Sequence, residues 1–307
     1  KPTRLERCVI LPGVVIDGQV KAGKPFFTYI QTIDPHVPYD PPAEDLKLYD
    51  AQPYEGPVSP RSTGDLLENF KQKRVVLEPR DRSHLEALYD GEVTYHDRHF
   101  GRFLDTLVKA KLLDDTIIVL CADHGEEFFE HESVGHGHTL FQELLHVPLC
   151  IRSPGLVPAG KRVKEDVNLS DVLPTVLAAI GQQPGKGIEG RNLLPAAQGA
   201  SAGPFNAAFS AFFSEADDRN LQWSARKGDW KIKMRGPVNT FLHNLAADPR
   251  EMNDVDEQNP VALRAMRILL SQFIGAPDKG DWTSGKIAAN AAVKPEAAED
   301  KTDNIPE

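Results

Sequence analysis

A decapeptide at residues 116–125 constrains the fold of this 307-residue chain more than any other feature. Its apolar and β-branched run, residues 116–122, predicts a strand that is buried on both faces. The run ends in Asp123, His124 and Gly125. Because open α/β sheets bind ligands just beyond the carboxyl ends of their strands, this order favours an α/β fold with a site after residue 122. Asp123 and His124 can supply an oxygen and a nitrogen ligand to a divalent metal, although a solvated strand end is the plainer alternative.

A dense run of carboxylates and imidazoles follows this strand end. Its members are Glu126, Glu127, Glu130, His131, Glu132, His136, His138, Glu143 and His146. Glycines alternate with histidines at residues 135–138, so the backbone can approach a ligand while imidazoles face it. Neutral imidazole serves as a metal ligand and as a proton donor or acceptor near neutral pH. We therefore expect a site here, and we expect Glu126, Glu127 and Glu132 to form only a solvated acidic loop.

Hydrophobic periodicity predicts the other elements. Strands are expected at residues 24–32, 147–152, 208–214, 222–227, 230–234 and 240–244, and helices at residues 84–111, 170–180 and 260–274. Ser83 and Glu86 form a capping box for the first helix, and Gly181 would end the second. The proline-rich residues 36–80 predict a long functional excursion with short helices.

Composition limits the classes of function and partner. Lys and Arg number 35 and Asp and Glu 45, for a net charge of −10, which argues against non-specific nucleic-acid binding. Cys8, Cys121 and Cys150 have neither metal-ligand spacing nor the pattern of a disulfide framework, and we expect Cys121 and Cys150 to be buried thiols within strands. The sequence contains no predicted membrane span or signal peptide, while its abrupt start leaves room for an upstream targeting segment.

Several motifs in one order resemble the sulfatase family of the alkaline-phosphatase-like superfamily. Residues 116–154 contain Asp-His-Gly-Glu, Glu-His, Gly-His-Thr-Leu-Phe, His-Val-Pro-Leu and Ile-Arg-Ser-Pro-Gly. Residues 29–42 are similar to the family's His-x-Pro segment, and residues 242–253 to its C-terminal leucine–acid–proline signature. Residues 171–177 and 190–195 fall in the same order, so the resemblance extends over residues 24–274.

The resemblance implies an alkaline-phosphatase-like three-layer α/β sandwich, present as its C-terminal half. Residues 1–203 would belong to this catalytic core. Residues 204–275 would form a small subdomain of antiparallel sheet plus helix. Residues 276–307 are poor in large apolar side chains and are expected to be a disordered tail.

The resemblance also assigns roles to individual residues. Asp123 and His124 match the family's later pair of metal ligands, and His36 matches a histidine that contacts the ester and can protonate the leaving oxygen. The alternative for His36 is a loop histidine packed beside Tyr39. The family lysine falls between His136 and His138, so either imidazole can replace it; His138 is preferred because it directly precedes Thr-Leu-Phe. The other histidine would then cap a helix or support the metal.

The implied cofactor is one divalent cation, with Ca²⁺ favoured and Mn²⁺ or Zn²⁺ as alternatives. The family's nucleophile is a formylglycine made in a Cys/Ser-x-Pro-x-Arg motif, and neither that motif nor the first acidic metal ligands occur in the 307 residues. We therefore expect a partner in a missing N-terminal half of the same protein.

The resemblance predicts a metal-dependent sulfuric-ester hydrolase acting on a sulfate-ester (or phosphate-ester) small molecule or glycan. A phosphodiesterase, phosphonate monoester hydrolase or phosphoethanolamine-type transferase of the same superfamily is the first alternative. A non-catalytic sulfatase-like binding domain is the second. The compartment stays open, with a periplasmic, secreted or membrane-anchored protein expected from the family.

Overall fold

The computed structural model describes residues 24–200, 207–213, 221–236 and 239–275. These residues fall into two compact units. The first unit runs to His136 and includes Pro148–Ala159, and the second comprises Gly137–Val147 and the chain from Gly160 onward. The predicted boundary at residue 203, the predicted tail and Cys8 lie outside the described residues.

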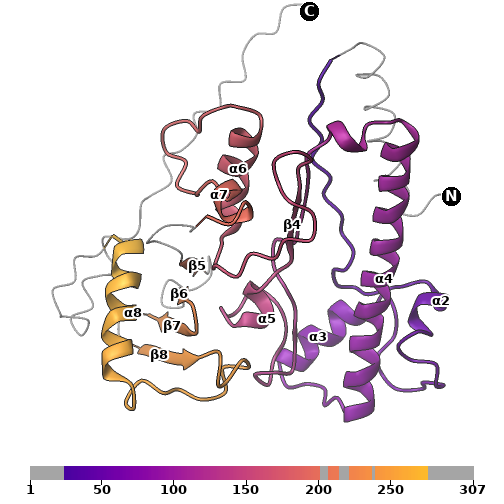
Figure 1. The fold of residues 1–307 in the computed structure, drawn as a ribbon. Helices are drawn as coiled ribbons and strands as arrows, with labels where there is room; N and C mark the ends of the chain where they lie inside the picture. Colours follow the sequence, from indigo (N-terminus) through magenta and orange to yellow (C-terminus); the bar gives the residue numbers. More distant parts are fainter. Residues whose placement is uncertain (1–23, 201–206, 214–220, 237–238, 276–307) are drawn as a thin grey trace, which may run out of the picture. The chain divides into compact units, whose positions relative to one another are not determined.

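The long helix α4 (Pro79–Lys109) dominates the first unit (Figure 1). It begins at Pro79 rather than at residue 84, and its capping box is formed by Glu78 and Asp81. Glu78 N donates to Asp81 Oδ2 at 2.9 Å, so the predicted box of Ser83 and Glu86 is wrong. Proline at the first helical position presets φ and lacks the N–H that would be left unpaired there, which explains the earlier start.

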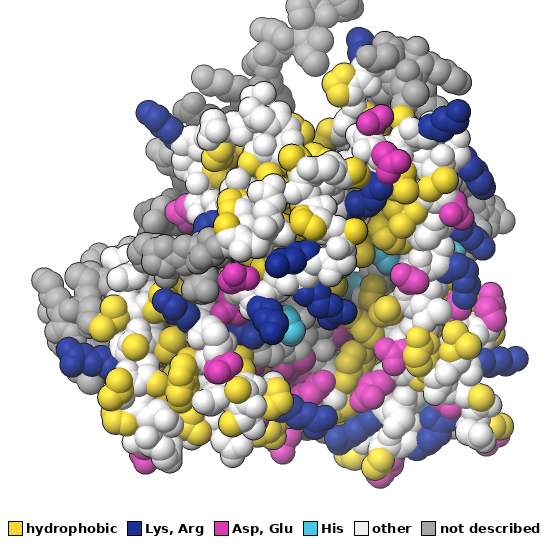
Figure 2. All heavy atoms as spheres, in the orientation of Figure 1, with side chains coloured by type: hydrophobic (Ala, Val, Ile, Leu, Met, Phe, Trp, Pro, Cys, Tyr) yellow, Lys and Arg dark blue, Asp and Glu magenta, His cyan; other side chains and the backbone are white. Residues whose placement is uncertain are grey.

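The core of the first unit forms where the buried face of α4 packs against the preceding proline-rich segment, residues 36–80. Two short helices, α2 (Ala43–Leu46) and α3 (Thr63–Lys71), lie in that excursion as predicted, and α2 packs against α4. The fully buried side chains of this core are Tyr39, Val58, Leu67, Leu77, Leu85, Leu88 and Val134. On the face seen in Figure 2, basic and acidic side chains alternate over α4, as expected for its solvated side.

The predicted strand before Asp123 is present but shorter and more open than expected. Strand β1 (Ile118–Cys121) pairs antiparallel with β4 (Leu149–Arg152), with Cys121 opposite Leu149. Among the described residues this sheet has two strands, so the prediction of burial on both faces is wrong. Cys121 and Cys150 are both exposed, which corrects the prediction of buried thiols.

No strand forms at residues 24–32 of the described chain. Phe27 and Tyr29, which suggested one, are 84% and 76% exposed. Their aromatic character raises β propensity, but a strand also needs a hydrogen-bonding neighbour, and no described strand pairs with this segment. The prediction of a strand there is wrong for the structure described.

The second unit contains the predicted antiparallel sheet and closing helix. Strands β5 (Ala208–Phe212), β6 (Gln222–Lys227), β7 (Trp230–Arg235) and β8 (Asn239–Asn244) pair in sequence order. Helix α8 (Pro260–Phe273) packs across β6 and β7. The core between sheet and helix contains Trp223, Ala225, Ile232, Met234, Leu242, Met266 and Leu270. The alternation read from the sequence therefore located these strands and this helix correctly.

Short elements connect these parts. They are η1 (Leu113–Asp115), β2 (Glu127–Phe128), β3 (Val134–Gly135), α5 (Gln142–Leu145), η2 (Leu169–Asp171), α6 (Val172–Ala179) and α7 (Leu194–Ala197). Gly181, with φ of +73°, follows α6 and ends it as predicted. Asp171 Oδ1 accepts the Arg191 N–H at 2.7 Å, which joins two of the motifs noted in the sequence. None of the helices in the described ranges is both long and apolar enough to cross a bilayer.

Candidate active site

Three of the predicted site residues gather in the first unit. The rings of His124 and His136 stack with centroids 4.0 Å apart. The His36 ring lies 5.1 Å from His136 and 6.5 Å from His124. The sequence places these histidines on three separate segments, and the fold brings them into one cluster, which we call the histidine cluster.

Each ring of the histidine cluster has Nδ1 beside an oxygen acceptor. The acceptor is Val37 O at 2.6 Å for His36, Gly125 O at 2.8 Å for His124, and Glu126 Oε1 at 2.9 Å for His136. Since a carbonyl or carboxylate oxygen only accepts, Nδ1 carries the hydrogen and Nε2 of the neutral ring carries the lone pair. All three imidazoles can therefore present Nε2 to a metal or to a proton in transit.

Asp123 and His124 have the donor set of a partial metal site. Asp123 Oδ1 lies 3.9 Å from His124 Nε2, and the two side chains are 73% and 38% exposed. The backbone carbonyl behind His124 Nδ1 fixes the ring in the way that supporting groups fix metal-binding histidines. One carboxylate oxygen and one imidazole nitrogen fit a divalent cation, and they fill only part of its coordination sphere.

Glu126 lies under the cluster rather than in solvent. Its residue is 8% exposed, and its two oxygens accept the Tyr39 hydroxyl and His136 Nδ1–H, both at 2.9 Å. Glu127 is fully buried, and its Oε1 accepts the N–H groups of His131 and Ser133 at 3.1 Å. The prediction of a solvated acidic loop is therefore wrong for both residues. They lie at the start of the β2–β3 hairpin, and their side chains are buried.

The β2–β3 hairpin explains why Glu126 meets His136. Its antiparallel register pairs Glu127 with Gly135. Continuing the register by one residue brings Glu126 opposite His136, and opposite residues lie within side-chain reach. Gly135 has φ of +79°, a conformation that glycine adopts without strain, and a Cβ there would lie 3.2 Å from Lys71 Nζ.

Two buried side chains near the histidine cluster, Tyr39 and Glu92, have raised pKa values. Burial raises the pKa of Tyr39, with the nearby Glu126 charge as the second cause, so its hydroxyl stays a donor at every working pH. Burial also raises the pKa of Glu92 to about 8, because its residue is only 4% exposed. Glu92 Oε1 accepts the Asp40 N–H at 2.7 Å and so fixes the backbone next to Tyr39.

His138, the preferred lysine replacement in the sequence, belongs to the second unit. Its backbone carbonyl accepts Gln222 Nε2–H at 2.9 Å from β6. The segment Gly137–Val147, which we call the anchor loop, is held to the C-terminal sheet by this bond and by buried charges. Lys231 Nζ donates to Leu140 O at 2.7 Å and lies 2.8 Å from Glu251 Oε1.

Glu251 completes this anchoring. Its Oε2 accepts the Gln142 N–H at 2.7 Å, while Lys233 Nζ lies 3.0 Å from the centroid of the Phe141 ring. Burial lowers the pKa of Lys233 to about 8. Burial lowers the pKa of Lys231 too, and the Glu251 charge opposes that shift.

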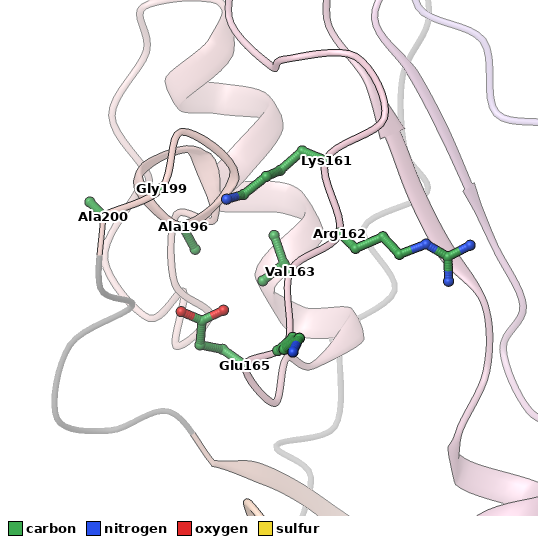
Figure 3. A pocket seen from close by; sticks show the side chains of 8 residues that line it. Lys161, Arg162, Val163, Glu165, Ala196, Gly199 and Ala200 are labelled. Atoms are coloured by element: carbon green, nitrogen blue, oxygen red, sulfur yellow. The ribbon is translucent and has the colours of Figure 1, made fainter.

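A separate hollow of about 410 Å³ opens in the second unit, lined by residues 161–165 and by Ala196, Gly199 and Ala200. The Lys161 and Glu165 side chains point toward it, whereas Arg162 points away (Figure 3). Opposite charges thus face the same hollow, and it lacks the convergent groups of the histidine cluster.

Comparisons with known proteins agree with the motifs. The Sulfatase family model matches residues 14–182. Choline-sulfatase of Rhizobium meliloti (strain 1021) is 28% identical over 264 residues, which cover 80% of this chain and 50% of that protein. The multifunctional alkaline phosphatase superfamily protein PehA of Trinickia caryophylli is 26% identical over 56% of this chain and 37% of its own length. The chain thus spans half or less of these relatives.

Solved structures share the fold at low identity. Phosphonate monoester hydrolase of Agrobacterium radiobacter superposes with a TM-score of 0.73 at 23% identity, over 89% of this chain and 62% of that chain. BT4656, in complex with its substrate D-glucosamine-2-N,6-O-disulfate, gives a TM-score of 0.71 at 17% identity over 90% and 70% of the two chains. The α/β, alkaline-phosphatase-like fold predicted from the sequence is confirmed. With more than half of its residues matched by the family model, this chain belongs to the sulfatase family.

Proposed function

We propose that this chain carries part of the active site of a metal-dependent sulfuric-ester hydrolase. One observation carries the proposal: an Asp–His pair lies beside two further imidazoles, and all three rings are fixed through Nδ1. Such a site can bind a cation and exchange a proton with the same substrate. A sulfate-ester small molecule or glycan is the proposed substrate class, supported by the disulfated glucosamine bound to BT4656.

The residues take distinct roles in this proposal. Asp123 and His124 hold the divalent cation, which when bound supplies positive charge to the ester oxygens and to the nucleophile. His36 contacts the ester, and in its imidazolium form its Nε2–H would deliver a proton to the leaving oxygen, which leaves the neutral ring with its hydrogen on Nδ1. His136 replaces the family lysine when its ring is an imidazolium, whose Nε2–H would stabilise negative charge at the reacting group.

We assign the lysine's role to His136 rather than to His138. The His136 ring contacts both other rings of the histidine cluster, and its Nδ1–H is held by a buried carboxylate. His138 contributes its carbonyl to the anchor loop. The preference for His138 based on its place before Thr-Leu-Phe is therefore reversed in this proposal.

The rest of the site is proposed to come from residues outside the sequence given. The Cys/Ser-x-Pro-x-Arg motif does not occur in it, and Asp123 with His124 supplies only part of a cation's ligands. A formylglycine-type nucleophile and further carboxylates would complete the site. Ca²⁺ is the proposed ion, with Mn²⁺ or Zn²⁺ as alternatives that imidazole ligands also suit.

A phosphonate monoester hydrolase is the second candidate. The specific observation in its favour is the likeness to the phosphonate monoester hydrolase of Agrobacterium radiobacter. Both candidates use the same cluster, so they differ in the ester that is turned over.

The test is a substrate panel with the complete polypeptide and added Ca²⁺ or Mn²⁺. Turnover of 4-nitrophenyl sulfate above that of phosphonate monoesters supports the sulfatase proposal. Turnover of phosphonate monoesters or phosphate diesters alone would replace it with the second candidate. If every ester stays inert while a sulfated sugar still binds, the chain is part of a non-catalytic binding domain.

A further inference from the structure

We propose that Glu126 is a positioning residue, whose buried carboxylate joins the Tyr39 hydroxyl to the Nδ1–H of His136 and fixes that ring with Nε2 available to the substrate. The inference rests on the proposed function, because it concerns the imidazole that we assign to charge stabilisation. It extends that function by naming the group that orients His136.

The contacts of Glu126 link the three segments that form the cluster. Tyr39 lies on the same segment as His36, three residues further along the chain. Glu126 itself follows His124 by two residues, and His136 lies on the far strand of the β2–β3 hairpin. One carboxylate with two bonds of 2.9 Å therefore holds all three segments in a common geometry.

Burial makes these two bonds consequential. The Glu126 side chain is 3% exposed and Tyr39 is fully buried, so water competes little for either bond. A charged acceptor gives stronger and shorter hydrogen bonds than a neutral one. The Tyr39 ring is itself held edge-on by Tyr89 and lies against Phe128. The hydroxyl is thus a fixed donor, and it sets the orientation of the carboxylate.

The orientation of His136 follows from the same geometry. With Nδ1–H donated to Glu126, the neutral ring is held as one tautomer, and the imidazolium is held with its Nε2–H toward the substrate. Rotation about χ2 would break the bond in either form. When a carboxylate that supports a metal-binding histidine is removed, activity or metal affinity typically falls about 10- to 100-fold, and His136 is held by a carboxylate in the same way. We expect a loss in that range when the Glu126 charge is removed.

The experiment compares Glu126→Gln and Tyr39→Phe with Tyr89→Phe, which deletes a hydroxyl from the neighbouring ring in the same aromatic group. The first readout is the ¹⁵N NMR spectrum of the imidazole rings in the 307-residue chain. Wild type should show the Nδ1–H tautomer at His136, and Glu126→Gln should give a mixture. The His243 ring, whose Nδ1 faces Asn253 O at 3.0 Å in the second unit, should stay unchanged.

The second readout is sulfate-ester turnover by the complete polypeptide. Glu126→Gln should lower kcat about 10- to 100-fold with little change in KM. Tyr39→Phe should act in the same direction and less strongly, and Tyr89→Phe should match wild type. Tyr39→Phe keeps the ring, so it tests the link even if Glu126→Gln lowers the thermal stability.

The two readouts separate this inference from the proposed function. If Glu126→Gln alters the His136 tautomer but the complete polypeptide is inert toward sulfate esters, Glu126 still orients His136 and the proposed activity is wrong. An active wild type whose tautomer and kcat are unchanged in Glu126→Gln and Tyr39→Phe would overturn the inference and leave the activity standing.

Discussion

Breaking the buried ion pair beneath the anchor loop should strongly destabilise the second unit. Lys231 is fully buried, and its Nζ lies 2.8 Å and 2.9 Å from the two oxygens of Glu251. Lys231→Met would leave the Glu251 carboxylate buried without its counter-charge. Removing one partner of a buried pair costs about 3–5 kcal/mol, because the remaining charge is uncompensated. We expect a loss of unfolding free energy in that range.

The double variant Lys231→Met/Glu251→Gln tests the origin of the loss. Glutamine keeps an acceptor for the Gln142 N–H, so the lost Lys231 bond to Leu140 O is the main remaining defect. One neutral hydrogen bond contributes about 0.5–1.5 kcal/mol, and a bond to a charged group about 1.5–3 kcal/mol. The double variant should therefore recover about 2 kcal/mol of the loss in the single variant.

Urea unfolding followed by tryptophan fluorescence is the assay, since Trp223 and Trp230 lie on β6 and β7 of this sheet. Lys227→Met, at an exposed position on β6, is the control and should change stability by no more than about 0.5 kcal/mol. A loss below about 1 kcal/mol for Lys231→Met would refute the reasoning from the uncompensated charge. A double variant that is no more stable than Lys231→Met would also refute it, because lost packing would then account for the lower unfolding free energy.

Two further predictions follow from titration and exposure. The raised pKa of Glu92, about 8 in the folded state, means that the folded state binds more protons than the unfolded state between about pH 4.5 and 8. Stability conferred by this group is present at low pH and is lost as pH rises through 8, with a slope of at most about 1.4 kcal/mol per pH unit. Urea titrations followed by circular dichroism give the unfolding free energy at pH 5 and at pH 8. The stability lost between these two pH values should be smaller in Glu92→Gln than in wild type, and an equal loss in both proteins would contradict the assignment. Cys121 and Cys150 should both react with a thiol reagent in the folded 307-residue chain because both are exposed. Partial burial, and secondarily the charge of Asp123, raises the pKa of Cys121, so its labelling rate should keep rising above the pH at which a free thiol is fully ionised; protection of both thiols would refute the exposed β1–β4 pair.

Local patterns predicted the C-terminal sheet and its helix well because these elements satisfy their own sequence signals. Strands β6, β7 and β8 alternate and pair with their neighbours in the chain, so short-range periodicity is enough to locate them. In the first unit, Phe27 and Tyr29 have strand propensity without a described partner strand. The strand propensity of a segment does not show whether a neighbouring strand is present to pair with it.

The sequence indicated candidate site residues but not the geometry in which they lie. Asp123 and His124 follow from the end of the strand, and His36 from the family resemblance. The choice between His136 and His138, and the burial of Glu126, depend on the register of the β2–β3 hairpin. Each strand of that hairpin has only two residues, too few for an alternating pattern to indicate which side chains face inward.

The central claim, that Asp123 and His124 hold the cation of a sulfuric-ester hydrolase, is tested most directly by metal-dependent turnover. The complete polypeptide would be stripped of metal, and 4-nitrophenyl sulfate hydrolysis followed as Ca²⁺ is added back. Wild type should recover activity, whereas Asp123→Asn and His124→Ala should need more than about 10-fold more Ca²⁺, the lower limit seen when only supporting groups of a metal site are lost. An unchanged Ca²⁺ requirement in both variants, or hydrolysis that persists without metal, would contradict the account.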